Sequence, residues 1–220
     1  MSGLDPSHWT ARQGIVTMQS AMCGPNPILR FGDSLSEEMW MGMPTNPPTL
    51  LGHNANVLNF GLMGAGVTDL TAYRDYMLSA ANPWCVLFQC GTNDCITGQP
   101  FDQLAWQAVF DAHVAAMVAH SSVVKVICKS IPPVFGPGVG YDQDHVNDLN
   151  RSIHNVCALH PKTTFLDLDP WLKCASTGYI RPGYTCDNTV HLSGYAAWTV
   201  AWLEYETVVG QALGPPPPPC

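Results

Sequence analysis

The stretch that decides the fold is "ILRFGDSLSEEMW", residues 28–40. An apolar run ends at Gly32, and an acid and a serine, Asp33 and Ser34, follow at a point where a helix could begin. In an open parallel sheet, ligands bind beyond the carboxyl ends of the strands, which would place Ser34 at a binding edge. Alternatively, Asp33 or Ser34 caps a helix that starts near Ser36. This stretch alone leaves both interpretations open.

Apolar runs alternate with amphipathic stretches along the rest of the chain, which is typical of parallel strands joined by crossover helices. The expected strands are short and lack polar alternation, so both faces of the sheet should be covered. The sequence therefore predicts an α/β fold, a three-layer α/β/α sandwich around a five-stranded parallel sheet. The expected strands are residues 28–31, 55–60, 84–90, 123–129 and 163–168, and the expected helices are residues 8–22, 68–79, 101–120, 142–160 and 192–213.

Helical spacing also predicts which side of the third expected helix packs on the sheet. The apolar residues that recur at this spacing are Leu104, Val109, Val114 and Met117.

A length of 220 residues suits one domain with a sizeable core. We expect a single domain over residues 1–213 and a proline-rich tail over residues 214–220. The tail, "GPPPPPC", favours polyproline II and cannot join a core. A further domain beyond the tail would fit a longer protein.

The charge balance argues against two classes of partner. With 9 Lys and Arg against 17 Asp and Glu, the net charge of -8 opposes binding to nucleic acid or to an anionic membrane surface. No apolar run approaches the roughly 20 residues that span a bilayer, and the first residues lack the pattern of a signal peptide. The cysteine count favours a secreted or organellar protein, whereas the missing signal fits an intracellular one, so the localisation stays open.

Nine cysteines are an odd number, so at least one is unpaired within the chain. None forms a Cys-x-x-Cys pair, and we expect no zinc site. Cys174 and Cys186 bracket a short irregular segment and are the preferred disulfide, with Cys90 and Cys95 as a second possibility. Three cysteines are expected to be buried small hydrophobes instead: Cys85, Cys128 and Cys157.

Two further loops carry groups suited to catalysis. "NFGLMGAGVTDL", residues 59–70, follows the second expected strand, and its glycines let backbone amides approach a ligand. "CGTNDC", residues 90–95, follows the third strand and offers the side-chain amide of Asn93, although asparagine is also a common turn former. Together with Ser34, these loops have the composition of a serine site with an oxyanion hole.

A serine nucleophile needs a base, which is usually a histidine oriented by a carboxylate. The chain has eight histidines, and context must choose among them. His191, in "YTCDNTVHLSGYAAW", lies in a loop before the last expected helix, with Asp187 four residues upstream. The others lie near the N-terminus or in segments without clustered partners, which favours surface or packing roles. His191 is the best candidate for the base.

The blocks "FGDSLS", "NFGLMGAGVT", "GTNDC" and "DNTVHLSGY" occur in the order and approximate spacing of the GDSL, or SGNH, hydrolase superfamily. The chain resembles that superfamily from about residue 28 to residue 203. The resemblance implies a flavodoxin-like sandwich and a serine esterase that uses neither a metal nor another cofactor.

The resemblance also implies roles for individual residues. Ser34 matches the nucleophile, His191 the base and Asp187 the acid that orients it. The oxyanion hole would be formed by the backbone amides of Ser34 and Gly64 and the side-chain amide of Asn93.

The last block departs from the usual Asp-x-x-His spacing of the family. Three residues separate Asp187 from His191, and Asn188 occupies the usual place of the acid. Asn188 or a backbone carbonyl is therefore an alternative to Asp187 as the group that orients His191. The segment from His191 to the following Gly-Tyr pair is also shorter than usual, which affects the expected start of the last helix.

The resemblance is greatest to compact esterases, so we expect hydrolysis of short-chain esters, acetyl esters above all, through an acyl-enzyme on Ser34. The expected substrate is a small-molecule or carbohydrate ester. A lysophospholipase or thioesterase-type acyl hydrolase is one alternative, and a non-catalytic carbohydrate-binding module on the same fold is another. A nucleotide binder fits poorly, because no loop carries a Gly-x-x-x-x-Gly-Lys pattern.

Overall fold

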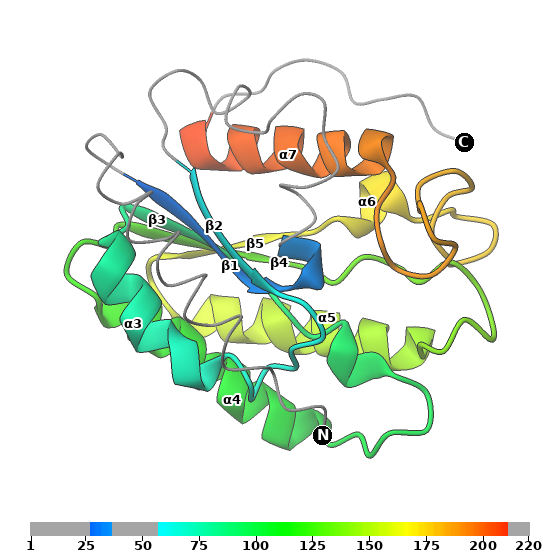
Figure 1. Ribbon diagram of the computed structural model, residues 1–220, viewed down its shortest axis with the longest axis horizontal. Helices are drawn as coiled ribbons and strands as arrows, with labels where there is room; N and C mark the ends of the chain where they lie inside the picture. Colours follow the sequence, from blue (N-terminus) through cyan, green and yellow to red (C-terminus); the bar gives the residue numbers. More distant parts are fainter. Residues whose placement is uncertain (1–26, 37–56, 211–220) are drawn as a thin grey trace.

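The computed structural model describes residues 27–36 and 57–210. Its middle layer is a sheet of five strands in the order β2-β1-β3-β4-β5 (Figure 1). Every neighbouring pair of strands runs parallel, which confirms the five-stranded parallel sheet. The strands are β1 Ile28–Asp33, β2 Val57–Leu62, β3 Cys85–Gln89, β4 Lys125–Lys129 and β5 Thr163–Leu166.

Helices cover both faces of the sheet, so the predicted α/β/α sandwich is confirmed (Figure 1). Helices α3, α4 and α5 lie on one side, and α7 lies on the other side with the short α6. The sequence did not predict α6 or the short η2, because neither is long enough to show a period. The helices are α3 Thr71–Ala81, η2 Asn93–Cys95, α4 Gln103–Ala119, α5 Gln143–Leu159, α6 Asp169–Leu172 and α7 Gly194–Val209.

Two expected segments lie wholly outside the described residues: the helix over residues 8–22 and the proline-rich tail over residues 214–220. The last helix, α7, starts two residues later than expected, where Ser193 Oγ accepts a hydrogen bond from Ala196 N at 3.5 Å. Within the described part of the chain, the helices are too short or too polar to cross a membrane.

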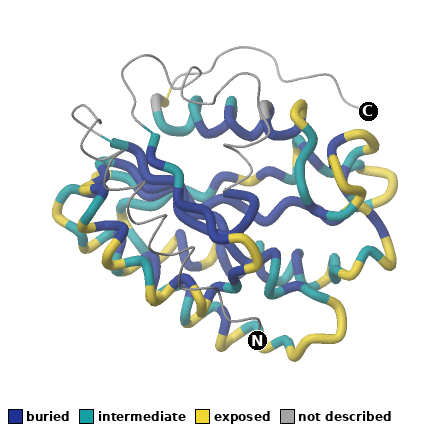
Figure 2. Tube along the Cα trace, in the orientation of Figure 1, coloured by how far each residue is buried: buried dark blue, intermediate teal, exposed yellow. Residues whose placement is uncertain are grey.

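Aromatic rings form the core between the sheet and helices α3, α4 and α5. Phe31 of β1 stacks against Phe60 of β2 and Phe88 of β3, with ring centroids 5.8 Å and 5.7 Å away. Phe110 of α4 stacks on Phe88 at 5.0 Å and on Trp106 at 5.0 Å. Burying each such ring contributes about 1.5–3 kcal/mol relative to leaving it exposed. Strands β1, β3 and β4 are buried almost throughout, whereas the edge strand β5 is only partly buried at three of its four residues (Figure 2).

Helix α4 packs on the sheet with most, but not all, of the predicted residues. Val114 and Met117 are buried, and Val109 packs against the core. Leu104, in contrast, is 78% exposed, so its predicted burial is wrong. Trp106 takes the inward position, and a residue two places earlier on a helix lies about 200° around the axis, which turns Leu104 to solvent.

The face of the sheet toward α7 holds a buried ionic cluster. Arg30 of β1 donates from Nε to Glu204 Oε2 of α7 at 3.0 Å, and Lys129 of β4 donates from Nζ to Glu204 Oε1 at 2.6 Å. None of the three side chains is more than 2% exposed. Burial alone would raise the pKa of Glu204, but the two cations outweigh it and hold this pKa below its ordinary value. The charged carboxylate therefore pins α7 to β1 and β4.

Neither expected disulfide, Cys174–Cys186 or Cys90–Cys95, forms in the described part of the chain. Cys90 and Cys95 are both fully buried but unbonded. Cys174 contacts the hydroxyl of Ser176 at 3.2 Å rather than Cys186. Spacing in the sequence does not show where each Cβ points, and a disulfide depends on that geometry. The other expectation for cysteines is confirmed, since three are buried as small hydrophobes: Cys85, Cys128 and Cys157.

We predict that Glu204→Ala destabilises the fold severely. Arg30 and Lys129 would remain buried without a counter-charge, so the free energy of unfolding should fall by about 3–5 kcal/mol. Urea denaturation followed by circular dichroism measures this change. The control is Arg151→Ala, which removes the exposed ion pair with Asp148 on α5 and should cost less than about 1 kcal/mol. Equal losses in the two variants would show that the buried cluster does not anchor α7.

Candidate active site

The predicted site residues lie on loops that leave one edge of the sheet. Ser34 begins a helical turn directly after β1, Gly64 lies in the loop after β2, and Asn93 begins η2 after β3. The carboxyl ends of parallel strands share an edge, so these loops are neighbours. Asp187 and His191 lie in the loop that leads into α7, whose first turn is at the same end of the molecule (Figure 1).

Asp33 supplies the helix cap that the sequence left open between two residues. Its Oδ1 accepts a hydrogen bond from Leu35 N at 3.0 Å. Its Oδ2 accepts one from Thr92 N at 3.2 Å, in the loop that carries Asn93. Ser34, 3% exposed, begins the turn that Asp33 caps. Because Asp33 caps this turn, helix capping does not explain why a serine stands at position 34.

The end of β1 approaches β3 closely enough to bury the Asp33 carboxyl completely. A Cβ at Gly32 would lie 1.7 Å from Gln89 O of β3, so only glycine permits this approach. Burial raises the pKa of Asp33 to about 6, although the amides of Leu35 and Thr92 oppose the shift. A titratable group with a raised pKa therefore sits directly beside Ser34.

The two proposed oxyanion donors outside Ser34 lie in the loops after β2 and β3. Asn93 Nδ2 donates to Ala65 O at 3.0 Å, and its second hydrogen remains for another acceptor. Gly64 has a φ of 74°, in the left-handed region that favours glycine, and Ala65 N returns to Leu62 O at 3.2 Å. Within residues 27–36 and 57–210, no group accepts a hydrogen bond from the Gly64 amide. The amide is therefore available to a ligand.

Asp94 organises the same loops, although sequence reasoning did not single it out. Its Oδ2 accepts hydrogen bonds from Val67 N at 2.9 Å and Trp106 Nε1 at 3.0 Å. Burial raises the pKa of Asp94, against the effect of these two hydrogen bonds. Asp94 lies within the quoted "GTNDC", but an aspartate in such a loop is equally typical of a turn. It joins the glycine loop to α4.

His191 and Asp187 form a hydrogen-bonded pair. His191 Nδ1 donates to Asp187 Oδ2 at 2.5 Å, and the two side chains are 29% and 34% exposed. Thr189 also donates to Asp187, from its N at 2.9 Å and its Oγ1 at 2.5 Å. Burial alone would raise the pKa of Asp187, but the hydrogen bonds from Thr189 and His191 outweigh it and lower this pKa. With Nδ1 bound to the acid, Nε2 is the nitrogen that can accept a proton.

The additional residue before His191 is accommodated at Asn188. Its φ of 57° lies in the left-handed region, which asparagine tolerates better than most residues. This bend returns the chain so that the Asp187 carboxylate meets both Thr189 and the imidazole.

A hydrogen bond between Ser34 and His191 is not required before a substrate binds, because catalytic hydrogen bonds are often long in the free enzyme. Among the residues whose positions are described, no three His, Cys, Asp or Glu side chains gather as metal ligands.

Comparison with known proteins identifies a family and a fold. The model of the GDSL-like Lipase/Acylhydrolase family matches residues 31–197. No curated protein sequence matches the chain. Among solved structures, a GDSL-like lipase from Bacteroides thetaiotaomicron is similar at a TM-score of 0.72 and 16% identity, with 90% of this chain and 97% of that chain covered.

Two further solved structures have the same fold. A lipase/acylhydrolase from Enterococcus faecalis gives a TM-score of 0.68 at 17% identity over 85% of this chain and 100% of that chain. The acetyl xylan esterase AlAXEase gives 0.69 at 20% identity over 83% and 99%. At these identities the likeness establishes the fold.

We predict that Asp33 makes stability depend on pH. Its pKa is about 6 in the folded protein against an ordinary value of 3.8, so the folded state binds a proton that the unfolded chain has released. The resulting stabilisation, about 3 kcal/mol, is present below about pH 4 and is lost as the pH rises through 6. Asp33→Asn cannot titrate, so its stability relative to wild type should improve by about that amount from pH 4 to pH 7.

Urea denaturation at several pH values tests this expectation. Ser34→Ala changes the neighbouring residue without removing a titratable group, and its pH profile should run parallel to that of wild type. If Asp33→Asn also runs parallel to wild type, Asp33 is not the titrating group.

Proposed function

Because the chain belongs to the GDSL-like lipase/acylhydrolase family and is a carboxylic ester hydrolase, we propose that it cleaves short-chain acyl esters, acetyl esters above all, through an acyl-enzyme on Ser34. The observation that carries the proposal is the hydrogen bond between His191 and Asp187. It orients a base at the end of the molecule where Ser34 lies. An acetyl xylan esterase of the same fold supports acetyl as the acyl group.

The first half of the reaction forms the acyl-enzyme. Ser34 Oγ attacks the ester carbonyl carbon while His191 Nε2 takes the hydroxyl proton. Asp187 stabilises the imidazolium that results, and its lowered pKa keeps it ionised. The carbonyl oxygen becomes an oxyanion and accepts hydrogen bonds from the amides of Ser34 and Gly64 and from Asn93 Nδ2. Each such donor typically contributes on the order of 100- to 1,000-fold in turnover. Collapse of this first tetrahedral intermediate completes the acyl-enzyme, and His191 gives its proton to the leaving alcohol.

The second half releases the acid. Water attacks the acyl carbonyl, and His191 takes a proton from that water. Collapse of the second intermediate returns the proton to Ser34 Oγ and frees the carboxylic acid, so the enzyme is regenerated.

We predict that Asp187 and Asn188 differ sharply in their contribution to turnover. Asp187→Ala should lower kcat/KM for p-nitrophenyl acetate by on the order of 1,000- to 10,000-fold, because His191 loses its orienting acid. Asn188→Gly is the matched control, since glycine keeps the left-handed backbone while removing the side chain. It should stay within about threefold of wild type. The reverse order would assign the orienting role to Asn188, and two mild effects would assign it to a backbone carbonyl.

Chain-length selectivity and covalent labelling test the proposed function directly. We expect p-nitrophenyl acetate to be cleaved at least about 10-fold more efficiently than the octanoate, and an organophosphonate to label one residue per chain. Peptide mapping should place the label on Ser34, and Ser34→Ala should abolish both labelling and turnover. A preference for octanoate would indicate a lysophospholipase-like enzyme. A folded protein with neither labelling nor turnover would be a binding module.

A further inference from the structure

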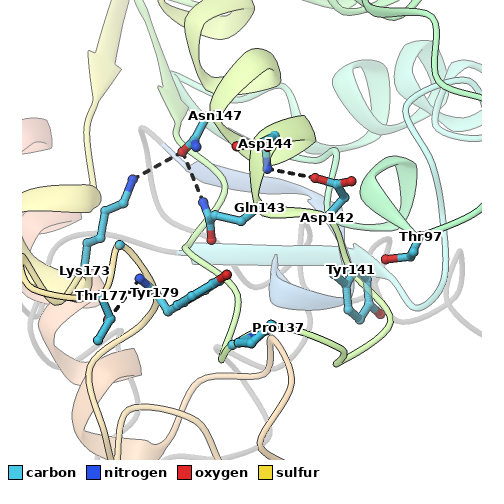
Figure 3. Close-up of a pocket in the computed structure, with 12 residues that line it drawn as sticks. Thr97, Pro137, Tyr141, Asp142, Gln143, Asp144, Asn147, Lys173, Thr177 and Tyr179 are labelled. Atoms are coloured by element: carbon cyan, nitrogen blue, oxygen red, sulfur yellow. Dashed lines mark hydrogen bonds between the residues drawn. The ribbon is translucent and has the colours of Figure 1, made fainter.

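A polar cavity of about 460 Å³ lies between the loops that follow β3, β4 and α6 (Figure 3). Its volume falls within the roughly 300–1,000 Å³ that is usual for small-molecule sites. None of the five proposed catalytic residues lines it, so it is a separate compartment. The lining residues that matter here are Tyr141, Asp142, Gln143, Asn147, Lys173 and Tyr179.

The walls of the cavity are hydrogen-bonded to two loops that carry proposed catalytic residues. On one side, Asp142 N donates to Cys95 O at 2.8 Å, which ties the cavity wall to the short helix that carries Asn93. On the other side, Phe135 N donates to Thr189 O at 2.9 Å, in the loop that carries the proposed acid and base. Gly136, directly after Phe135, lines the cavity. The walls of the cavity are therefore hydrogen-bonded both to the segment that follows Asn93 and to the loop that carries Asp187 and His191.

The charged side chains of the lining favour a neutral ligand. Asp142 Oδ1 accepts hydrogen bonds from two amides of the first turn of α5, at 2.8 Å and 3.2 Å. Lys173 Nζ donates to Asp169 Oδ2 at 2.8 Å and to Asn147 Oδ1 at 3.2 Å. A phosphate would meet the carboxylates of Asp142 and Asp144, and the one cation of the lining, Lys173, is already paired with Asp169. The lining therefore opposes an anion and has no uncompensated cation to bind one, whereas a neutral polar ligand meets no such repulsion.

Uncharged donors and aromatic rings complete the lining. Asn147 Oδ1 also accepts a hydrogen bond from Gln143 Nε2 at 3.1 Å, so its oxygen is occupied. No residue in the described ranges accepts a hydrogen bond from Asn147 Nδ2. Figure 3 shows the rings of Tyr141 and Tyr179 among the lining side chains. Aromatic rings beside amide donors suit a molecule that presents apolar C–H faces and hydroxyl groups together.

We propose that this cavity binds a neutral saccharide unit of the ester substrate, which makes the enzyme a carbohydrate deacylase. The proposal rests on ester hydrolysis at Ser34. The rings of Tyr141 and Tyr179 pack against the C–H faces of the sugar, and Asn147 Nδ2 donates to a hydroxyl. The saccharide in the cavity lies on the alcohol side of the ester, and the acyl group lies at Ser34.

Binding of unacylated oligosaccharides tests the cavity independently of catalysis. The probes are xylotetraose, cellotetraose and mannotetraose, titrated into the whole protein by calorimetry, with glycerophosphocholine as the charged alternative. We expect at least one tetrasaccharide to bind and glycerophosphocholine not to bind. Binding of glycerophosphocholine alone, or of none of the four, would overturn the proposal.

Two variants locate the bound saccharide. Asn147→Asp keeps an oxygen for Lys173 and Gln143 but replaces the amide donor, so the fold is preserved while Kd for the tetrasaccharide should rise about 10-fold. Tyr179→Ala removes one ring and should weaken binding by a similar factor. Tyr76→Ala, on α3, is the matched control and should leave Kd unchanged. An unchanged Kd in both cavity variants would place the saccharide elsewhere and contradict the proposal.

Kinetics separate this inference from the proposed function. In Asn147→Asp, the ratio of kcat/KM for the acetylated tetrasaccharide to kcat/KM for p-nitrophenyl acetate should fall about 10-fold, because only the former substrate reaches the cavity. A ratio equal to that of wild type would overturn the subsite. A protein that binds the tetrasaccharide but hydrolyses neither ester would support the subsite and refute catalysis at Ser34.

Discussion

The candidate site depends on the buried carboxylate of Asp33. It accepts hydrogen bonds from Leu35 within its own loop and from Thr92 in the loop after β3, so the segments that carry Ser34 and Asn93 are held together. An aspartate suits this position because both of its oxygens accept hydrogen bonds, whereas an asparagine offers only one acceptor. The raised pKa of Asp33 is the cost of placing this group away from water. The proposed nucleophile and one proposed oxyanion donor are thus held by the same carboxylate.

The loop that carries Asp187 and His191 is held in place by α7, which packs on the other face of the sheet. His191 lies just before α7, so whatever anchors α7 also anchors His191. Glu204 connects the helix to two strands, and Lys125 Nζ donates to Thr207 O near the C-terminal end, where the helix dipole is negative. A buried ion cluster contributes little net stabilisation compared with apolar packing, but α7 cannot slide or rotate without leaving charges unpaired. We therefore interpret the role of the cluster as fixing the position of α7 along strands β1 and β4.

The sheet could be predicted from the sequence because its central strands, β1, β3 and β4, are short apolar runs that are buried on both faces. The ends of the strands could not be predicted in this way. Strand β1 continues through Gly32 to Asp33 because its pairing with β2 continues there, although no apolar side chain marks these two positions. The exposure of Leu104 could not be predicted either, because helical spacing defines an apolar stripe on α4 but does not show which of two overlapping stripes faces the sheet. The disulfides failed for a related reason, since spacing along the chain does not measure distance in space.

The sequence names the proposed site residues one by one, but it does not show the contacts that connect them. The sequence placed Ser34, Asn93 and His191 in blocks that the fold brings to one end, and it left the partner of His191 open. The contacts that organise the loops join residues far apart in the chain: Asp33 reaches Thr92 across 59 positions, and Asp94 reaches Val67 across 27. No local pattern signals such pairs.

Thr189 links the proposed acid, Asp187, to the wall of the cavity. The link depends on the three residues that separate Asp187 from His191. The left-handed Asn188 turns the chain back, so the amide and hydroxyl of Thr189 both reach Asp187. The carbonyl of the same residue accepts a hydrogen bond from Phe135, whose neighbour lines the cavity. A ligand that moved this wall would therefore shift the peptide that holds Asp187. The additional residue does not weaken the acid: it gives Asp187 two further hydrogen bonds and ties its position to the compartment in which we place the saccharide.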